Sequence, residues 1–165
     1  MEKDTHLTNR ELILDAFRNM KRGRRGAMWA PHKPLLLLLA LKRIRSGEPR
    51  LMEFEEVELV LRDLMATLRE EGWKPNPNYP FWRLRKDEIW EVEPSEELER
   101  SENESGDVSS KHLRAVGARA GLKKMVDQAL RADRSLLAEV EELLLGLLEP
   151  PEVRGVVKRK VDSMF

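Results

Sequence analysis

The chain has 165 residues and a mass of 19.2 kDa, which is a length typical of one domain. Hydrophobic residues make up 41% of it, and it contains only 9 Gly and 9 Pro, so the composition excludes a disordered, collagen-like or low-complexity chain. The absence of cysteine excludes disulfides, thiolate metal sites and a cysteine nucleophile.

The net charge is zero, but the charges are unevenly distributed. Residues 1–50 carry 12 Lys/Arg against 5 Asp/Glu, residues 51–108 carry 7 against 17, and residues 109–165 carry 11 against 8. This asymmetry favours a surface that binds a polyanion. The polar N-terminus and the lack of an apolar run of about 20 residues predict a cytoplasmic protein with no membrane partner.

The first two helices have clear start signals. Residues 8–11 (TNRE) form a capping box, and apolar residues follow at helical spacing as far as Met20. Pro34 suits the first turn of a second helix, because the N–H that it lacks would be unpaired there. Residues 35–39 are all apolar, so this helix, predicted to end near Arg45, should be buried on most sides.

The middle of the chain is predicted to contain the β-structure. Residues 51–54 read as a short extended segment, and residues 57–68 as an amphipathic helix. Two aromatic-rich runs, residues 79–84 and 88–92, predict a β-hairpin. Residues 94–108 are acidic and rich in serine, which predicts a mobile loop.

The last third is predicted to be helical. A helix should begin near residue 110 behind a serine cap, and Gly117 and Gly121 should weaken or end it. Others should follow over residues 122–130, 136–148 and 152–165, with Asp133 as the cap of the helix over 136–148. The predicted fold is therefore mainly α: a compact helical domain with a short β-hairpin, in a winged-helix-like layout. We expect one domain to span residues 1–149, with residues 150–165 as a C-terminal helix or tail.

Catalytic motifs are missing. The sequence has no Walker loop, no dinucleotide-binding glycine fingerprint, no His-Glu-x-x-His and no Gly-x-Ser-x-Gly. Its histidines, His6, His32 and His112, lie at no spacing that would build a metal site or supply a general base. We therefore expect no catalytic residue, no metal and no cofactor, and we interpret the chain as a binding protein.

Four segments carry binding signals, and each also has a purely structural interpretation. Arg22, Arg24 and Arg25 lie among glycines and could follow a phosphate backbone, or simply end a solvated helix. His32 and Lys33 precede a helix N-terminus, which fits an anion site or an ordinary helix start. The aromatic side chains of residues 79–83 (YPFWR) could form part of a binding surface or pack in the hydrophobic core. The fourth segment combines hydroxyls, a cation and a helix dipole at a predicted cap: Ser109, Ser110, Lys111 and His112.

Four runs occur in a distinctive order: residues 30–38 (APHKPLLLL), 54–58 (FEEVE), 79–84 (YPFWRL) and 89–92 (IWEV). Together they resemble the sulfur-binding domain of McrA-type restriction endonucleases, over about residues 8–148. That family recognises DNA in which sulfur replaces one non-bridging phosphate oxygen. The family's endonucleases carry a separate HNH nuclease domain, which this sequence lacks, so cleavage would need a nuclease partner.

The resemblance implies roles for individual residues. Tyr79 and Pro80 would form the apolar wall of the sulfur pocket. Arg83 stands where the family can have a small residue, and would either complete the pocket or contact a phosphate. His32 and Lys33 would hold the modified phosphate. The remaining phosphate- and groove-binding candidates are Arg22, Arg24, Arg25, Ser109, Ser110, Lys111 and His112.

The leading hypothesis is a module that binds double-stranded DNA carrying phosphorothioate. One alternative is a general helical DNA-binding domain that ignores sulfur. Another is a protein-interaction module in which residues 136–148 and 152–165 form a homodimer face.

Overall fold

The computed structural model describes residues 8–25 and 28–164, and within them the predicted mainly α fold is confirmed. The helices are α1 (Asn9–Arg18), α2 (His32–Arg45), α3 (Phe54–Met65), α4 (Asn78–Arg83), α5 (Ser95–Glu99), α6 (Ser110–Ala115), α7 (Lys124–Ala132), α8 (Arg134–Gly146) and α9 (Val153–Asp162). The strands are β1 (Arg24–Arg25), β2 (Met28–Trp29), β3 (Met52–Glu53), β4 (Trp90–Glu93) and β5 (Arg119–Leu122). Two short 3₁₀ helices span Ala66–Glu71 and Leu84–Asp87.

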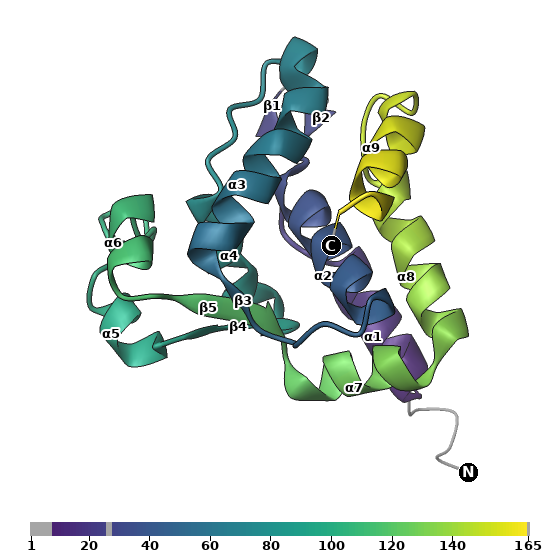
Figure 1. Ribbon diagram of the computed structural model, residues 1–165, viewed down its shortest axis with the longest axis horizontal. Coiled ribbons are helices and arrows are strands. Elements are labelled where there is room, and N and C mark those ends of the chain that lie inside the picture. The colour runs from purple at the N-terminus through teal and green to yellow at the C-terminus, as the bar shows by residue number, and fades with distance from the viewer. Residues whose placement is uncertain (1–7, 26–27, 165) are drawn as a thin grey trace.

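Helix α2 is the centre of the core. It lies between α3 and α8, and its contacts also include α4, α7 and α9 (Figure 1). Every residue from Pro34 to Leu41 is buried, as the continuous apolar run predicts. Because α2 is buried from Pro34 to Leu41, its position is fixed by the core, and its first residues, His32 and Lys33, lie at the surface where the helix begins.

Three predicted helix starts are confirmed by their side-chain caps. The hydroxyl of Thr8 accepts a hydrogen bond from Glu11 N at 3.1 Å, and the hydroxyl of Ser109 accepts one from His112 N at 3.1 Å. The carboxylate of Asp133 accepts from Leu136 N at 3.0 Å. Short polar side chains before an apolar periodic run therefore mark the starts of α1, α6 and α8.

The predicted β-hairpin over residues 79–92 is wrong in its first half. Residues Asn78–Arg83 form α4, and only the second run contributes a strand, β4. Helix α4 buries Phe81 against Phe54, with ring centroids 4.9 Å apart, and the Phe81 carbonyl accepts a hydrogen bond from the Trp90 indole at 2.9 Å. Aromatic residues next to a proline suit a strand, but a proline is also tolerated in a first helical turn, and packing decides here.

Strand β4 does not pair with residues 79–84 but with β5, a strand that the sequence analysis did not predict because helices were expected around it. The sheet has the antiparallel order β3-β5-β4, with Trp90 opposite Leu122 and Met52 opposite Ala120. Gly121 lies at the centre of β5, where an added Cβ would stand 2.3 Å from the Arg50 carbonyl oxygen. The glycine expected to weaken a helix therefore allows another part of the backbone to approach the sheet.

The acidic segment 94–108, expected to be a mobile loop, contains α5 and a turn built on Asn103. The Asn103 side-chain oxygen accepts hydrogen bonds from Ser105 N and Asp107 N, at 2.9 and 3.0 Å. Leu98 and Val108 are buried. These contacts give Asp107 and the following cap residue defined positions.

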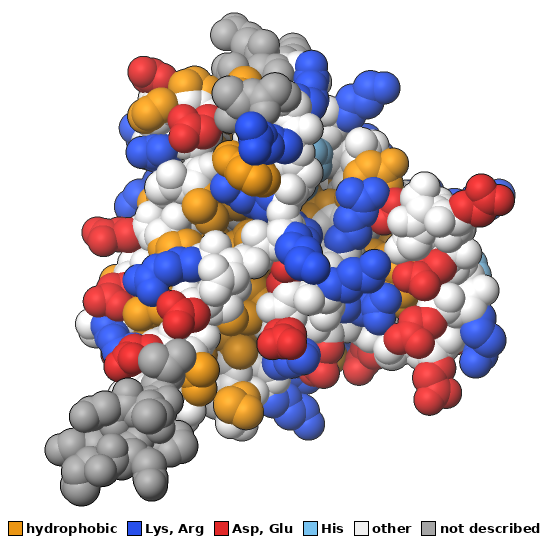
Figure 2. Space-filling model, turned by 180° about the vertical axis from the view of Figure 1, so that it is seen from behind, with side chains coloured by type: hydrophobic (Ala, Val, Ile, Leu, Met, Phe, Trp, Pro, Cys, Tyr) orange, Lys and Arg blue, Asp and Glu red, His pale blue; other side chains and the backbone are white. Residues whose placement is uncertain are grey.

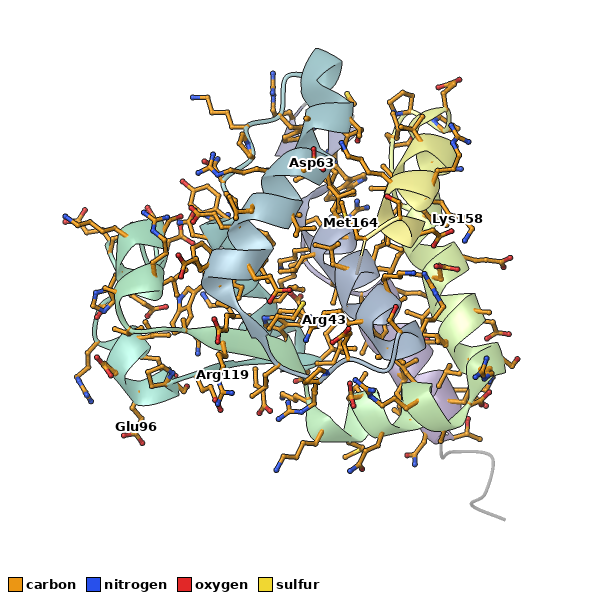
Figure 3. The ribbon with its side chains drawn as sticks, in the orientation of Figure 1. Arg43, Asp63, Glu96, Arg119, Lys158 and Met164 are labelled. Carbon is orange, nitrogen blue, oxygen red and sulfur yellow. The ribbon has the colours of Figure 1, made fainter. Side chains whose placement is uncertain are left out.

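Within residues 150–165, helix α9 packs against α3 and α8. Val157 and Val161 are buried, and Lys160 bridges to Asp63 on α3 with an N–O distance of 3.0 Å. Figure 3 shows Asp63 on α3, and Lys158 on α9. The apolar side chains that would have made a homodimer face, among them Leu144 and Val157, are thus used inside the chain. Among the helices of the described residues, none has the length and apolar character to cross a membrane.

Candidate nucleic-acid interface

A surface cavity of about 430 Å³ brings three of the four predicted binding segments together. It lies between the hairpin formed by β1 and β2, the start of α2, the loop after residue 71, and α4. Eight predicted site residues line it: Arg22, Arg24, Arg25, His32, Lys33, Tyr79, Pro80 and Arg83. The other lining residues are Gly23, Ala30, Gly72, Trp73, Lys74 and Asn76.

The apolar part of the cavity is formed by Tyr79 and Pro80, with Ala30 and Trp73. Tyr79 is half-buried and Pro80 is buried, and both border the same hollow as His32. Because Tyr79 and Pro80 are consecutive in a helix, their side chains reach the cavity from one turn of α4. Phe81 and Trp82 on the same helix are buried in the core instead.

Arg83 covers the apolar wall. Its guanidinium carbon lies 4.1 Å from the centroid of the Tyr79 ring. Its Nε and Nη2 atoms donate to the two carboxylate oxygens of Asp107, each at 2.6 Å. These hydrogen bonds raise the pKa of Arg83, and the carboxylate of Asp107 is itself only 4% exposed. Arg83 is therefore fixed in place over Tyr79 by a bidentate pair.

His32 points its ring into the cavity wall. Its Nε2 donates to the Lys74 carbonyl at 2.6 Å, and its ring meets Trp73 edge-on with centroids 6.0 Å apart. Burial lowers the pKa of His32 below 6.5, the hydrogen bond to Lys74 opposes this, and the charge of Arg83 lowers it further. At neutral pH the ring is therefore mainly neutral, with its hydrogen on Nε2.

Lys33 is already paired. Its Nζ donates to the Asp87 carboxylate and to the Lys21 carbonyl, both at 2.5 Å, and Asp87 accepts from Lys21 N at 2.8 Å. The Lys33 and Asp87 side chains are only 12% and 2% exposed. The ammonium group thus joins α2 to the 3₁₀ helix that follows α4, and its charge is balanced within the protein.

Sequence reasoning missed the two tryptophans beside the cavity. The guanidinium groups of Arg22 and Arg24 lie 5.4 and 5.0 Å from the ring centroid of Trp29, and that of Arg25 lies 5.2 Å from Trp73. Single tryptophans between basic residues could have indicated cation–π contacts, but only the fold shows which arginine meets which ring.

Residues 109–112 do not line the cavity, although they lie next to it in the chain. Ser109 caps α6, and the His112 ring bonds to the Ser101 hydroxyl at 2.9 Å. The two residues before this segment contact α4, which lines the cavity: Asp107 accepts a hydrogen bond from Arg83, and the Val108 carbonyl accepts one from Asn78 at 3.0 Å. The segment is thus anchored to the base of α4.

Charges are segregated on this side of the molecule. Figure 2 shows Lys and Arg side chains gathered over the middle and upper part of the face, while most Asp and Glu lie toward its sides. Among the side chains that the structure describes, the cavity is lined by six Lys or Arg residues and by no carboxylate. Asp87 and Asp107 are the buried partners of two of these cations, Lys33 and Arg83. Within the described part of the chain, no group of His, Asp and Glu is arranged to hold a metal ion.

Comparison with known proteins identifies a family from the sequence and similar folds among solved structures. The sequence matches the family described as ScoMcrA-like, DNA sulfur-binding domain, over residues 10–151. No curated protein sequence matches it. The sulfur-binding domain of ScoMcrA complexed with phosphorothioated DNA is 24% identical, with a TM-score of 0.75 over 95% of this chain and 99% of that one.

Two larger ScoMcrA structures contain the same fold. The sulfur-binding and SRA domains complexed with phosphorothioated DNA are 28% identical, with a TM-score of 0.67 over 80% of this chain and 41% of that one. The type IV phosphorothioation-dependent restriction endonuclease ScoMcrA is 24% identical, with a TM-score of 0.72 over 94% of this chain and 33% of that one. With the family match covering most of its length, the chain belongs to the ScoMcrA-like DNA sulfur-binding domain family.

Proposed function

We propose that this chain binds double-stranded DNA carrying a phosphorothioate, and that it does so through the cavity between α2, α4 and the β1–β2 hairpin. One observation carries the proposal: a single hollow joins the apolar wall of Tyr79 and Pro80 to a rim of cations. The family match and the phosphorothioated DNA in the related ScoMcrA complexes support it.

The apolar wall supplies discrimination. Sulfur is larger, softer and less strongly hydrated than oxygen, so placing it against a proline ring and a tyrosine costs little desolvation. A phosphate oxygen in the same place would lose hydrogen bonds to water without replacement, at a cost of ~1–3 kcal/mol. At about 1.4 kcal/mol for each tenfold, this corresponds to a preference of roughly five- to hundredfold.

The cations supply affinity. Arg22 and Arg25 donate to the carbonyls of Leu147 and Gly72, at 3.2 and 2.7 Å, and a neutral carbonyl does not cancel the charge of a guanidinium group. Lys33 and Arg83 are instead paired with buried carboxylates. In this proposal the hairpin arginines therefore dominate the attraction to phosphates, while Lys33 and Arg83 shape the cavity.

Base contacts would come from residues 109–112, the segment that directly follows Asp107 and Val108, which are bonded to α4. Donors at a helix start suit the edge of a groove, and side chains there would add sequence preference to the sulfur preference. The chain would bind without cleaving, and a nuclease partner would supply cleavage.

The direct test compares three duplexes of one sequence by fluorescence anisotropy: one with a single Rp phosphorothioate, one with the Sp isomer and one unmodified. The two isomers have identical composition and charge, so only the direction of the sulfur differs. We expect one isomer to bind roughly five- to hundredfold more tightly than the unmodified duplex. Equal affinities for all three would eliminate sulfur recognition and leave general DNA binding.

A variant links the preference to the cavity. Pro80→Ser should reduce the sulfur preference much more than the affinity for unmodified DNA, because it removes apolar surface and no charge. Pro49→Ser, at an exposed proline after α2, is the matched control and should change neither. An unchanged preference in the Pro80 variant would show that the sulfur sits elsewhere.

A further inference from the structure

We propose that the β1–β2 hairpin is a second DNA-binding element, in which Trp29 holds Arg22 and Arg24 in position to contact backbone phosphates beside the cavity. This inference rests on the proposed function, because the cavity would set where the duplex lies against the hairpin. It assigns a role to Trp29, which does not line the cavity.

The strand register places the tryptophan against its arginine. Arg24 and Trp29 are directly opposite each other in the antiparallel pair, so their side chains lie on the same face of the hairpin. Ala30 N donates to the Gly23 carbonyl at 2.8 Å and extends the pairing by one step. Arg22 reaches the same ring from just before β1, so one indole serves two guanidinium groups.

Trp29 is unusual among the four tryptophans because it is exposed. Its exposed fraction is 41%, whereas Trp82 and Trp90 are each 1% exposed and bond to protein acceptors through their indole nitrogens. Tryptophan is enriched among the residues that dominate binding interfaces, so an exposed tryptophan beside cations is a candidate for such a surface. Here the ring already carries guanidinium groups, so it acts as a positioning residue and the arginines make the contact.

The charge of this surface selects a polyanion. A cation–π contact orients a guanidinium group without neutralising it. Partial burial lowers the pKa of Arg22, the charge of Glu149 opposes this, and the hydrogen bond of Arg22 goes to a carbonyl. Arginine held in one orientation loses less rotamer freedom when it binds a phosphate. A duplex backbone beside the cavity presents phosphates in a row, which two fixed arginines can meet.

The test separates this element from the sulfur cavity by measuring modified and unmodified duplexes in parallel. Trp29→Ala should weaken binding of both duplexes by the same factor, about threefold to tenfold, and leave their ratio unchanged. It should also reduce the dependence of affinity on salt. Trp29→Phe keeps an aromatic ring and should restore most of the affinity. Leu59→Ala, at a leucine that is 70% exposed on α3, is the matched control and should have no effect.

A coupling experiment checks that Trp29 acts through arginine. Arg24→Gln should cost less affinity in the Trp29→Ala background than in the wild type, because the charge has already lost its orientation. Thermal unfolding by circular dichroism confirms that the compared variants are equally folded.

Two results would overturn the inference: a loss confined to the phosphorothioate duplex, which would place Trp29 in sulfur recognition, or no loss with either duplex. A wild type without sulfur preference would defeat the proposed function alone, since an equal loss on unmodified DNA would still support the hairpin contact.

Discussion

Lys33 shows how a buried partner changes the meaning of a basic residue. Beside a helix start it reads as a phosphate ligand, yet its ammonium group is shared between Asp87 and a backbone carbonyl. Arg83 is a similar case, since Asp107 accepts two of its hydrogen bonds. Both cations fix the cavity walls before any DNA arrives, which lowers the conformational cost of binding.

Replacing Lys33 should therefore affect folding first. Lys33→Ala leaves the Asp87 carboxylate buried and without its counter-ion, which we expect to cost ~3–5 kcal/mol of the free energy of unfolding. Urea denaturation measures this loss. The double variant Lys33→Ala with Asp87→Asn should recover part of it, because no charge is then left buried. A Lys33→Ala protein as stable as the wild type would show that the pair contributes little.

His32 makes stability depend on pH. Burial holds the pKa of His32 in the folded protein below its ordinary value of 6.5, so the unfolded chain binds a proton more readily. The contribution of His32 to stability is thus fully present above pH 6.5 and is lost progressively as the pH falls through 6.5 toward the lower folded-state pKa. Urea titrations at pH 7.5 and 5.5 test this, and His32→Asn should weaken the dependence. An equal dependence in the variant would assign it to other groups.

Among the elements, α4 and β5 decide where the site lies. Helix α4 places the consecutive residues Tyr79 and Pro80 against the cavity and the next two aromatic residues in the core. A strand could not do this, because its successive side chains point to opposite faces. Strand β5 joins β3 to β4 and leads from α6, so the segment after Asp107 is tied to the same scaffold. The hairpin at the cavity rim is a separate two-stranded unit.

Gly121 is the position where β5 should be most sensitive to substitution. In Gly121→Ala the new Cβ would stand 2.3 Å from the Arg50 carbonyl, and backbone would have to move, so we expect a loss of several kcal/mol in thermal or urea unfolding. Gly146→Ala is the control, because its Cβ meets nothing within 4 Å and alanine favours a helix by up to about 1 kcal/mol. Similar stabilities for the two variants would contradict this account of the sheet.

For the molecule as a whole, a net charge of zero hides a basic surface around the cavity. The acidic middle of the sequence contributes Asp87 and Asp107, the buried partners of Lys33 and Arg83, while the basic first third contributes the cationic rim of the cavity. In the proposed binding mode, attraction and discrimination therefore come from different residues: arginines of the hairpin on one side, and the α4 wall on the other.

This separation predicts parallel salt dependences. Raising salt from about 50 to about 200 mM should lower affinity for phosphorothioate and unmodified duplexes with the same slope, because both release the same counter-ions. The sulfur preference should stay constant, since it arises from desolvation rather than charge. Anisotropy titrations at four salt concentrations measure both quantities. A preference that changes with salt would mean that sulfur recognition involves an additional ion contact.

Local signals in the sequence predicted much of this protein. The caps at Thr8, Ser109 and Asp133, the buried helix behind Pro34 and the mainly α class all follow from hydrogen-bonding needs within a few residues and from apolar periodicity. The motif order indicated the family, and eight of the residues predicted for the site line the cavity.

What the residue pattern left open depended on contacts between distant parts of the chain. The first of the two predicted strands is a helix, in which Phe81 packs against Phe54 and its carbonyl accepts a hydrogen bond from Trp90. Residues 119–122 form a strand because β3 and β4 pair with them on either side. The charge state of the site likewise depended on Asp87 and Asp107, which lie 54 and 24 residues from the cations they pair with. Burial and ion pairing are long-range in sequence but short-range in space, so they could be assigned only once the chain was folded.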